Sequence, residues 1–288
     1  PIFNIMEKFV QRAKTLIEAL PYIKKFNSKT IVFKYGGSIG SKDFSNFARD
    51  IVLMKLVGIN PVIVHGGGVE ISKVLESLKI ESNFIDGLRV TCPKTMEVVE
   101  MVLGGKVNKE IVSKIIMNGG KSVGISGKDG GFLRVKKVKA SKKSQDLGRV
   151  GEITKVDIKL ITELQDNGYI PVVAPIGSNN KGVSYNINAD HAASKIASSL
   201  KAEKLIILTD VPGIQDEKRK LISSITKKTA NSLIRKGVIA KGMVPKVKCL
   251  VQALMDGVNK AHIIDGRIPH AVILETFTDS GIGTEILL

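Results

Sequence analysis

Six short, nearly all-apolar runs recur along the chain. They cover residues 30–35, 61–65, 122–126, 171–175, 204–210 and 261–265. Because polar residues do not alternate with the apolar ones, we expect strands buried on both faces, as in a parallel sheet covered by helices. Segments with helical spacing lie between the runs, at residues 69–78, 95–118 and 190–200. The alternation predicts an α/β fold with a doubly wound sheet, whose ligands bind beyond the carboxyl ends of the strands.

An amphipathic helix is predicted ahead of the first strand. Its apolar positions recur at helical steps until Pro21 is expected to end it; they are Phe9, Val10, Ala13, Leu16, Ile17 and Leu20. This stripe must be buried either on the body of its own subunit or on another subunit, and the pattern leaves both open. Farther along, the lysine-rich residues 136–148 are expected to form an exposed hairpin or loop.

Composition favours a soluble, cytoplasmic globule. The 288 residues are 43% hydrophobic and 25% charged, and no run approaches the roughly 18 uncharged apolar residues of a membrane helix. Charged residues interrupt the first twenty positions, so no secretory signal is expected there. The two cysteines, Cys92 and Cys249, give no disulfide framework and suggest a reducing compartment.

The net charge of +17 raises the possibility of nucleic-acid binding, but the residue types argue against it. Only 8 of the 44 basic residues are arginine, and the lysines are scattered along the chain. Arginine is the residue that reads phosphates and bases bidentately. Four tyrosines and nine phenylalanines leave little for base stacking. We therefore expect no nucleic-acid partner and no membrane partner.

Glycines follow the first two predicted strands. Gly36 and Gly37 come after the first, and Gly66, Gly67 and Gly68 after the second. Consecutive glycines let backbone N–H groups close on an oxyanion, with a helix N-terminus behind them. Neither matches the Walker or dinucleotide-binding glycine patterns, so each is a candidate phosphate or carboxylate cradle, with an ordinary tight turn as the alternative.

Two lysines stand where lysine is unexpected. Lys34 lies inside an apolar strand at its carboxyl end, where it either meets an anion or extends past the sheet edge. Lys246 follows Pro245, which is the expected first residue of a helix that ends at Gly257. The positive charge of Lys246 would therefore oppose the helix dipole unless an anion lies between the lysine and the helix N-terminus.

Polar residues also precede the helix predicted at residues 190–200. Asn186, Asn188 and Asp190 exceed what one helix cap requires, although capping remains an alternative. Thr209, Asp210 and Gly213 end a strand in a turn that could face a nucleotide.

Together these motifs resemble the acetylglutamate kinases of the amino acid kinase family over essentially the whole chain. The matching segments are residues 34–37, 64–68, 86–91, 95–110, 126–131, 185–190, 208–213, 242–246 and 265–267. The resemblance implies a three-layer αβα sandwich with a central, mostly parallel sheet shared by two lobes. It also implies phosphorylation of the γ-carboxylate of N-acetyl-L-glutamate by ATP, the second step of arginine synthesis by the acetylated route. Mg²⁺ is expected to be carried by the ATP phosphates, with no metal held by protein ligands.

The resemblance also implies a role for each motif residue. Lys34 and Lys246 would stabilise the transferring phosphoryl group, and Asp190 would hold them in register. The substrate would be bound by Gly67, Gly68, Arg89 and Asn186, the phosphate by Gly36 and Gly37, and the nucleotide by Thr209, Asp210 and Gly213. One departure is residues 38–40, Ser-Ile-Gly, where most relatives have Asn-Ala-Met; we expect activity to survive it.

The N-terminal helix and the C-terminal residues 275–284 resemble the arginine-inhibited branch of the family. In that branch N-terminal helices interlace dimers into a hexamer, and L-arginine binds beside them; the matching effector positions are His262, Glu275 and Gly281. Some relatives bind a PII-type signalling protein, which stays a possible partner here because the sequence carries no surface signature that decides it. The implied organisation is residues 1–24 for oligomerisation and regulation, 25–184 for acetylglutamate binding, and 185–288 for ATP and arginine. The alternative enzyme is a carbamate, aspartate or uridylate kinase. The alternative from another class of protein is a regulatory binding module that has lost catalysis.

Overall fold

The computed structural model describes residues 2–36, 41–139, 146–279 and 281–288. An eight-stranded sheet forms its centre, in the order β12-β14-β13-β11-β1-β2-β8-β5. The strand pairs are parallel except β13 with β14. The strands are β1 (Thr30–Tyr35), β2 (Asn60–His65), β5 (Ser122–Ser126), β8 (Ile170–Ala174), β11 (Lys204–Thr209), β12 (Ser224–Thr226), β13 (Lys260–Asp265) and β14 (Thr284–Leu287).

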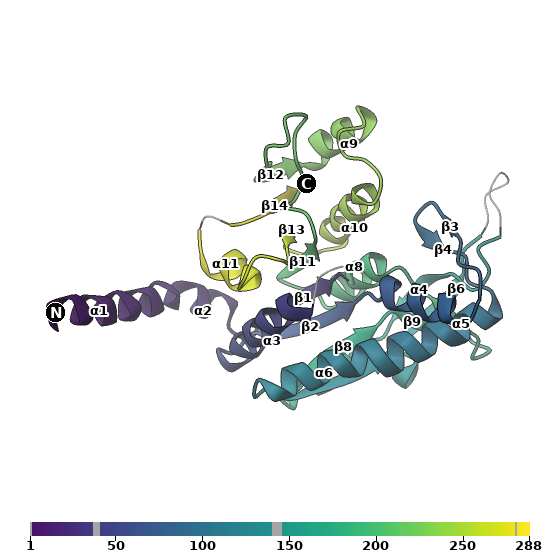
Figure 1. The fold of residues 1–288 in the computed structure, drawn as a ribbon, viewed down its shortest axis with the longest axis horizontal. Coiled ribbons are helices and arrows are strands. Elements are labelled where there is room, and N and C mark those ends of the chain that lie inside the picture. Colours follow the sequence, from purple (N-terminus) through teal and green to yellow (C-terminus); the bar gives the residue numbers. More distant parts are fainter. Residues whose placement is uncertain (1, 37–40, 140–145, 280) are drawn as a thin grey trace.

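Helices cover both faces of this sheet (Figure 1). On β1, Val32 faces the core cluster that contains residues of α8 (Ala189–Ser199) and α10 (Met243–Met255). Its neighbours Ile31 and Phe33 face the opposite cluster, beneath α3 (Ser41–Leu56), α6 (Asn108–Met117) and α11 (Ala271–Phe277). All three β1 side chains are fully buried. The three-layer sandwich with a mostly parallel central sheet is therefore confirmed.

A second sheet extends the fold on the side of β5. It has four strands in the order β10-β9-β6-β7. They are β6 (Leu133–Lys137), β7 (Gly151–Val156), β9 (Ile176–Ser178) and β10 (Ser184–Asn186). β6 and β7 pair antiparallel on either side of the predicted lysine-rich segment, whose residues 140–145 lie outside the described part of the chain. A small hairpin, β3 (Phe84–Ile85) with β4 (Leu88–Arg89), stands apart from both sheets.

The remaining helices are α4 (Gly68–Ser77), α5 (Pro93–Glu100), α7 (Lys159–Asp166), α9 (Lys227–Arg235) and the 3₁₀ turn Asp129–Gly131. The helix predicted at residues 69–78 is present as α4, whereas α7, α9 and the 3₁₀ turn had not been predicted. The long helix predicted at residues 95–118 is interrupted by a π-helical stretch, Met101–Val107, which contains two glycines. Pro245 is the third residue of α10, so the prediction that it is the first helical residue was wrong.

The N-terminal helix extends away from the body (Figure 1). It comprises α1 (Ile2–Glu18) and α2 (Leu20–Phe26), so the predicted amphipathic helix ends just before Pro21, but a second helix that was not predicted begins there. Pro21 instead occupies the first turn of α2, where its missing N–H costs nothing. Phe26 anchors α2 in the core at 2% exposure, whereas Leu16 and Ile17 of α1 are 75% and 67% exposed. The apolar stripe of α1 is not buried on its own chain.

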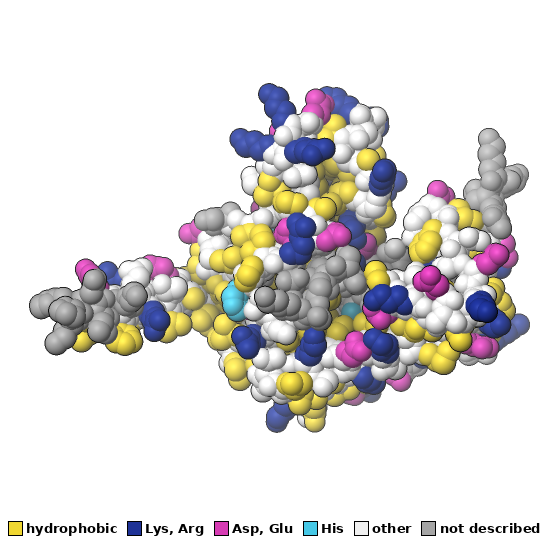
Figure 2. All heavy atoms as spheres, in the orientation of Figure 1, with side chains coloured by type: hydrophobic (Ala, Val, Ile, Leu, Met, Phe, Trp, Pro, Cys, Tyr) yellow, Lys and Arg dark blue, Asp and Glu magenta, His cyan; other side chains and the backbone are white. Residues whose placement is uncertain are grey.

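Basic side chains are spread over the surface in Figure 2 and do not form one continuous stripe. Among the described residues, no helix is both long and apolar enough to cross a membrane.

Candidate active site

Two lysines from opposite ends of the sequence share one buried carboxylate. Lys34 Nζ lies 3.0 Å from Asp190 Oδ1, and Lys246 Nζ lies 2.8 Å from Asp190 Oδ2. Lys34 is 7% exposed and Asp190 5% exposed. Lys34 comes from the carboxyl end of β1, Asp190 from the start of α8 and Lys246 from the first turns of α10. The structure thus places two positive charges side by side at the strand ends.

Electrostatics keep this carboxylate ionised. Burial raises the pKa of Asp190, but the attraction of Lys34 and Lys246 outweighs it and leaves that pKa below its ordinary value. Burial lowers the pKa of Lys34, Asp190 opposes this, and the charge of Lys246 adds to the lowering. The two lysines repel each other, so they stay close only because Asp190 lies between them. A bound anion would relieve the same repulsion.

The capping alternative applies to one residue of the segment before α8. The side chain of Asn188 accepts hydrogen bonds from the backbone N–H groups of Asp190 (2.9 Å) and His191 (3.1 Å), so Asn188 is the cap. Asp190 is left to face the lysines. Asn186 donates from Nδ2 to Thr91 Oγ1 at 3.3 Å and borders a cavity.

That cavity, of about 180 Å³, lies between the two halves of the predicted site. Gly67, Gly68 and Arg89 line one side, and Asn186 and Ala189 line the other. The structure therefore brings together all four residues predicted to bind substrate. Ala189 directly precedes Asp190, so the cavity opens beside the lysine pair.

Arg89 is held in place by protein partners. Its Nη2 donates to Gly68 O and to Ser72 Oγ, both at 2.9 Å, and its Nη1 donates to Ser82 Oγ. The guanidinium carbon lies 4.5 Å from the centre of the Phe84 ring. These contacts hold the guanidinium in one orientation, which suits bidentate recognition of a carboxylate. The sequence analysis did not single out Ser72 or Ser82.

Close packing explains why position 67 is glycine. A Cβ there would lie 2.5 Å from Leu103 Cδ2, in the π-helical stretch that packs against the loop. Gly67 caps α4, and Gly68 is its first residue, so both N–H groups belong to the helix end that has no intrahelical acceptor. Gly36 follows β1 beside them, whereas the predicted phosphate ligand Gly37 lies outside the described residues.

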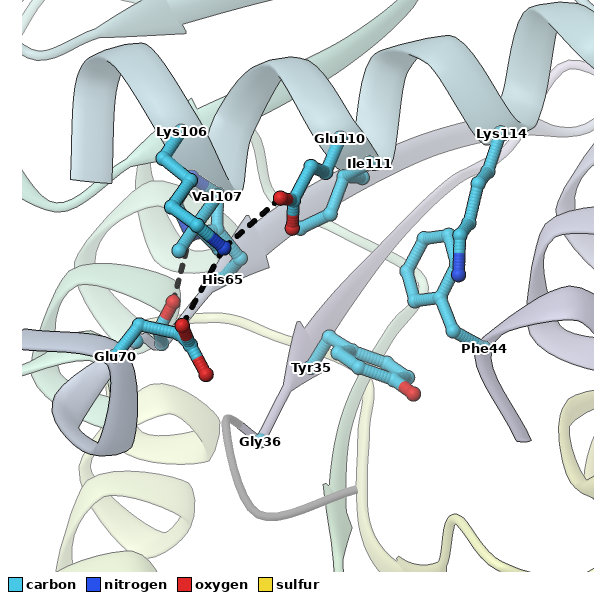
Figure 3. Close-up of a pocket in the computed structure, with 12 residues that line it drawn as sticks. Tyr35, Gly36, Phe44, His65, Glu70, Lys106, Val107, Glu110, Ile111 and Lys114 are labelled. Atoms are coloured by element: carbon cyan, nitrogen blue, oxygen red, sulfur yellow. Dashed lines mark hydrogen bonds and ion pairs between the residues drawn. The ribbon is translucent and has the colours of Figure 1, made fainter. Parts of the chain in front are cut away.

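Gly66 and Gly67 also line a neighbouring cavity of about 190 Å³ (Figure 3). His65, Glu70 and Lys106 contribute to it, and Lys106 bridges Glu70 and Glu110. The sequence analysis did not single out His65. Its side chain is fully buried and contacts Asn108, a residue 43 positions away.

The predicted nucleotide residues lie at the carboxyl end of β11, the strand next to β1. Thr209 is buried, its carbonyl accepts from Gly266 N–H at 2.8 Å, and Asp210 follows it. Gly213 has φ +142°, and a Cβ there would lie 2.8 Å from Thr284 Oγ1, so the turn requires glycine.

A separate cavity of about 320 Å³ contains the three predicted effector residues, His262, Glu275 and Gly281. His262 Nδ1 lies 2.8 Å from Glu275 Oε1, and Ile282 N–H donates to Glu275 Oε2 at 2.9 Å. Tyr22 of α2 donates to Asp279 on the rim at 2.5 Å. The N-terminal helix thus reaches this cavity through its second half.

Possible metal ligands do not gather at these sites. In the part of the chain that the structure describes, no group of three or more His, Cys, Asp or Glu residues is placed to hold a metal ion. Asp190, the carboxylate at the centre, already has a lysine on each oxygen.

Comparisons with known proteins agree with this fold. Residues 29–265 match the model of the amino acid kinase family. The chain belongs to this family, a class of phosphotransferases. Within it, the chain is 54% identical over 294 residues to the acetylglutamate kinase of Heliobacterium modesticaldum, covering 98% of this chain and all of that one. Other relatives at 51–54% identity carry the same name, so the chain groups with the acetylglutamate kinases.

Solved structures give the same result for the fold. N-acetylglutamate synthase from Neisseria gonorrhoeae, complexed with coenzyme A and N-acetyl-glutamate, matches with a TM-score of 0.87 and 26% identity over 96% of this chain. The same synthase complexed with coenzyme A and L-arginine matches with a TM-score of 0.83 and 25% identity over 96% of this chain. This chain spans 63% and 65% of the length of those two chains.

Proposed function

We propose that the protein transfers the γ-phosphoryl group of ATP to the γ-carboxylate of N-acetyl-L-glutamate, forming N-acetyl-L-glutamyl 5-phosphate for arginine synthesis. The observation that carries this proposal is the Lys34–Asp190–Lys246 centre beside a cavity that presents Arg89. The names of the relatives point to the same reaction. Residues 25–184 would form the acetylglutamate lobe, and residues 185–288 the ATP lobe.

The chemistry needs charge neutralisation and positioning more than proton transfer. The acceptor is a carboxylate, which is ionised at neutral pH, so no general base is required. Lys34 and Lys246 would face the phosphoryl oxygens from two directions, while Asp190 keeps their spacing. The N–H groups of Gly67 and Gly68 would add hydrogen bonds to these oxygens.

ATP would bind toward Thr209, Asp210 and Gly213, at the carboxyl end of the strand next to β1. Magnesium would arrive on the ATP phosphates. The lysines on Asp190 occupy both oxygens of that carboxylate, so the centre itself offers no resident metal site.

Substrate choice tests this function directly. ADP release is measured with N-acetyl-L-glutamate, glutamate, aspartate, carbamate and UMP as acceptors. Arg89 and Asn186 face one cavity sized for a small acylated dicarboxylate, so kcat/KM should be highest for N-acetyl-L-glutamate, by about 10²-fold or more. A preference for carbamate, aspartate or UMP would overturn the proposal.

Arg89→Ala should chiefly raise the KM for N-acetyl-L-glutamate, by about tenfold or more, with kcat changing much less. An ion pair with the substrate α-carboxylate is equally strong in the ground and transition states, so it contributes uniform binding. Steady-state kinetics with each substrate varied in turn decide the matter. A rise in the KM for ATP instead would assign Arg89 to the nucleotide.

We also propose that L-arginine inhibits the enzyme from the cavity containing His262, Glu275 and Gly281. A buried carboxylate suits a guanidinium: the pKa of Glu275 is raised by burial, but the His262 contact and other bonds leave it below its ordinary value. The arginine complex of the related synthase supports a site for this ligand in the fold.

A hexamer is proposed for the assembly, built by the N-terminal helices from three dimers. The exposed apolar stripe of α1 supports it; the large exposed side chains are Met6, Phe9, Val10, Leu16 and Ile17. Exposed apolar faces of this length are typical of interaction surfaces.

Deleting residues 1–24 should abolish or strongly weaken arginine inhibition while catalysis continues. The deletion removes α1 and Tyr22, which reaches the cavity rim, but keeps Phe26 in the core. Arginine can inhibit only if it binds one arrangement of helix and lobe better than another. Inhibition curves and sedimentation are measured together, and the truncated chain should sediment as a dimer. Tyr22→Phe is the matched variant, which removes only the hydroxyl contact and should keep the hexamer. Undiminished inhibition in the truncated chain would contradict the role of the helix in arginine inhibition, and a truncated chain that still sediments as a hexamer would contradict its role in the assembly.

A further inference from the structure

A buried polar network lies directly behind the glycines of the cradle. His65 is fully buried and Asn108 is 1% exposed. Nδ2 of Asn108 lies 3.2 Å from His65 Nε2, and Nδ1 of His65 lies 2.8 Å from the carbonyl oxygen of Gly66. The network thus connects α6 to the backbone of the glycine loop, and Figure 3 shows His65 beside that loop.

The orientation of Asn108 determines which nitrogen of His65 carries the proton. Asn108 Nδ2 also lies 3.0 Å from the carbonyl oxygen of Val172, which can only accept, and Lys109 Nζ donates to Asn108 Oδ1 at 3.2 Å. Nδ2 is therefore the group facing His65, and Nε2 must accept from it. A neutral imidazole that accepts at Nε2 carries its hydrogen on Nδ1, so His65 donates to Gly66 O.

Burial lowers the pKa of His65 to about 4. The nearby charge of Lys109 adds to this lowering, whereas the hydrogen bond to Gly66 opposes it. The imidazole is therefore neutral at pH 7. A neutral ring with one fixed donor and one fixed acceptor defines a single arrangement of this network, because the other tautomer would place Nε2–H against the Asn108 amide donor and the Nδ1 lone pair against Gly66 O.

The bond to Gly66 O fixes a peptide plane. The structure has no cis peptide bond among its described residues, so the C=O of Gly66 and the N–H of Gly67 point in opposite directions. With the carbonyl held toward His65, the Gly67 N–H points away from that ring, and Gly67 itself lines the substrate cavity together with Gly68 and Arg89. We propose that His65 and Asn108 are positioning residues that aim the Gly67 N–H at the oxygen atoms of the transferring phosphoryl group, an inference that rests on the proposed function.

A glycine on a neighbouring strand leaves space for the side chain of Asn108. Gly124, on β5, faces Asn108 so closely that a Cβ there would lie 1.8 Å from Asn108 Oδ1. The glycine therefore lets the amide sit between β5, β8 and His65. Replacing Gly124 with alanine should displace Asn108 and thereby misalign the Gly67 N–H, although the substitution lies on β5 and not in the glycine loop.

Two amide replacements of His65 separate positioning from simple packing. Asn places its amide near the Nδ1 position, so His65→Asn keeps a donor for Gly66 O; Gln extends to the Nε2 position, so His65→Gln keeps only the Asn108 contact. We expect His65→Gln to lower kcat about 10-fold to 10²-fold with the KM for N-acetyl-L-glutamate within about threefold, and His65→Asn to recover most of the loss. Thermal unfolding of both variants is the accompanying control. Equal kcat values for the two variants, or full activity in His65→Gln, would overturn the proposal.

The tautomer is measured on the unmodified protein. The chain has four histidines, so ¹⁵N-histidine labelling gives few imidazole signals, and the His65→Gln variant identifies the one from His65. We expect hydrogen on Nδ1, none on Nε2, and no titration between about pH 5.5 and 8. Hydrogen on Nε2 would refute the network whatever the substrate. If the acceptor assay identifies a different substrate, the proposed function fails while this measurement still decides the positioning role, and the kcat comparison is repeated with that acceptor.

Discussion

Lys34→Ala and Lys246→Ala should each slow phosphoryl transfer by about 10²-fold or more. Each removes a preorganised positive charge from a largely buried site, where such charges stabilise the transition state most strongly. Because the phosphoryl oxygens carry the developing charge, the loss should fall on kcat more than on the KM for either substrate. Single-turnover rates at saturating ATP and N-acetyl-L-glutamate measure the chemical step.

Lys195→Ala is the matched control for both lysines. Lys195 lies on the same helix as Asp190 and forms its own ion pair with Asp256 at 3.0 Å, but both side chains are about one-third exposed. Exposed pairs contribute little, so its rate should stay near that of the unmodified protein. Losses below tenfold in both Lys34→Ala and Lys246→Ala would remove these lysines from the catalytic centre.

The sheet was predictable because its strands are buried on both faces. Residues 30–35 and 122–126 coincide with β1 and β5, and the other four runs fall within one residue of their strands. Burial on two faces requires apolar residues at consecutive positions, and that requirement is local in sequence. The four short strands of the second sheet lack such runs; β7 alternates buried with exposed positions and was not predicted.

Helix details depended on packing between distant segments. The spacing at residues 95–118 predicted a continuous helix, but the π-helical stretch within it allows Leu103 to pack against Gly67. Pro21 was expected to end a helix, and it begins the second one. Proline is compatible with both positions, and the second helix that it begins carries Phe26 into the core.

The sequence identified the residues of the candidate site, but it did not predict which of them contact one another. Buried placement marked Lys34, and an unfavourable dipole marked Lys246, yet nothing local indicated that both contact Asp190. That partner was implied by family resemblance, and its catalytic role stays a prediction. His65 and Asn108 are joined only by the fold, because 43 residues separate them.

Asp190→Asn should cost both activity and stability. The substitution preserves shape but leaves the ammonium groups of Lys34 and Lys246 in a buried site without their shared negative charge. Removing one partner of a buried ion pair typically costs about 3–5 kcal/mol, and kcat should fall by about 10²-fold or more as the lysines move apart. Asp256→Asn is the control, since its pair with Lys195 is partly exposed and contributes at most about 1 kcal/mol.

The pH dependence of Asp190→Asn distinguishes lost charge from general damage. In the unmodified protein Asp190 has a lowered pKa, so its stabilisation is complete above the ordinary pKa of 3.8 and is lost only as pH falls through the lowered value. Lys34 has a lowered pKa that Asp190 partly restores. Without Asp190 the pKa of Lys34 in the folded protein falls further. The unfolded chain then binds more protons than the folded one over a wider pH range, which extends down from about pH 10.5. The free energy of unfolding should therefore rise with pH more steeply in the variant. Its deficit relative to the unmodified protein should shrink between about pH 7 and about pH 10. The loss of kcat at alkaline pH should also move to lower pH in the variant. A deficit that is constant across this range would show that Asp190 acts by packing and not by its charge.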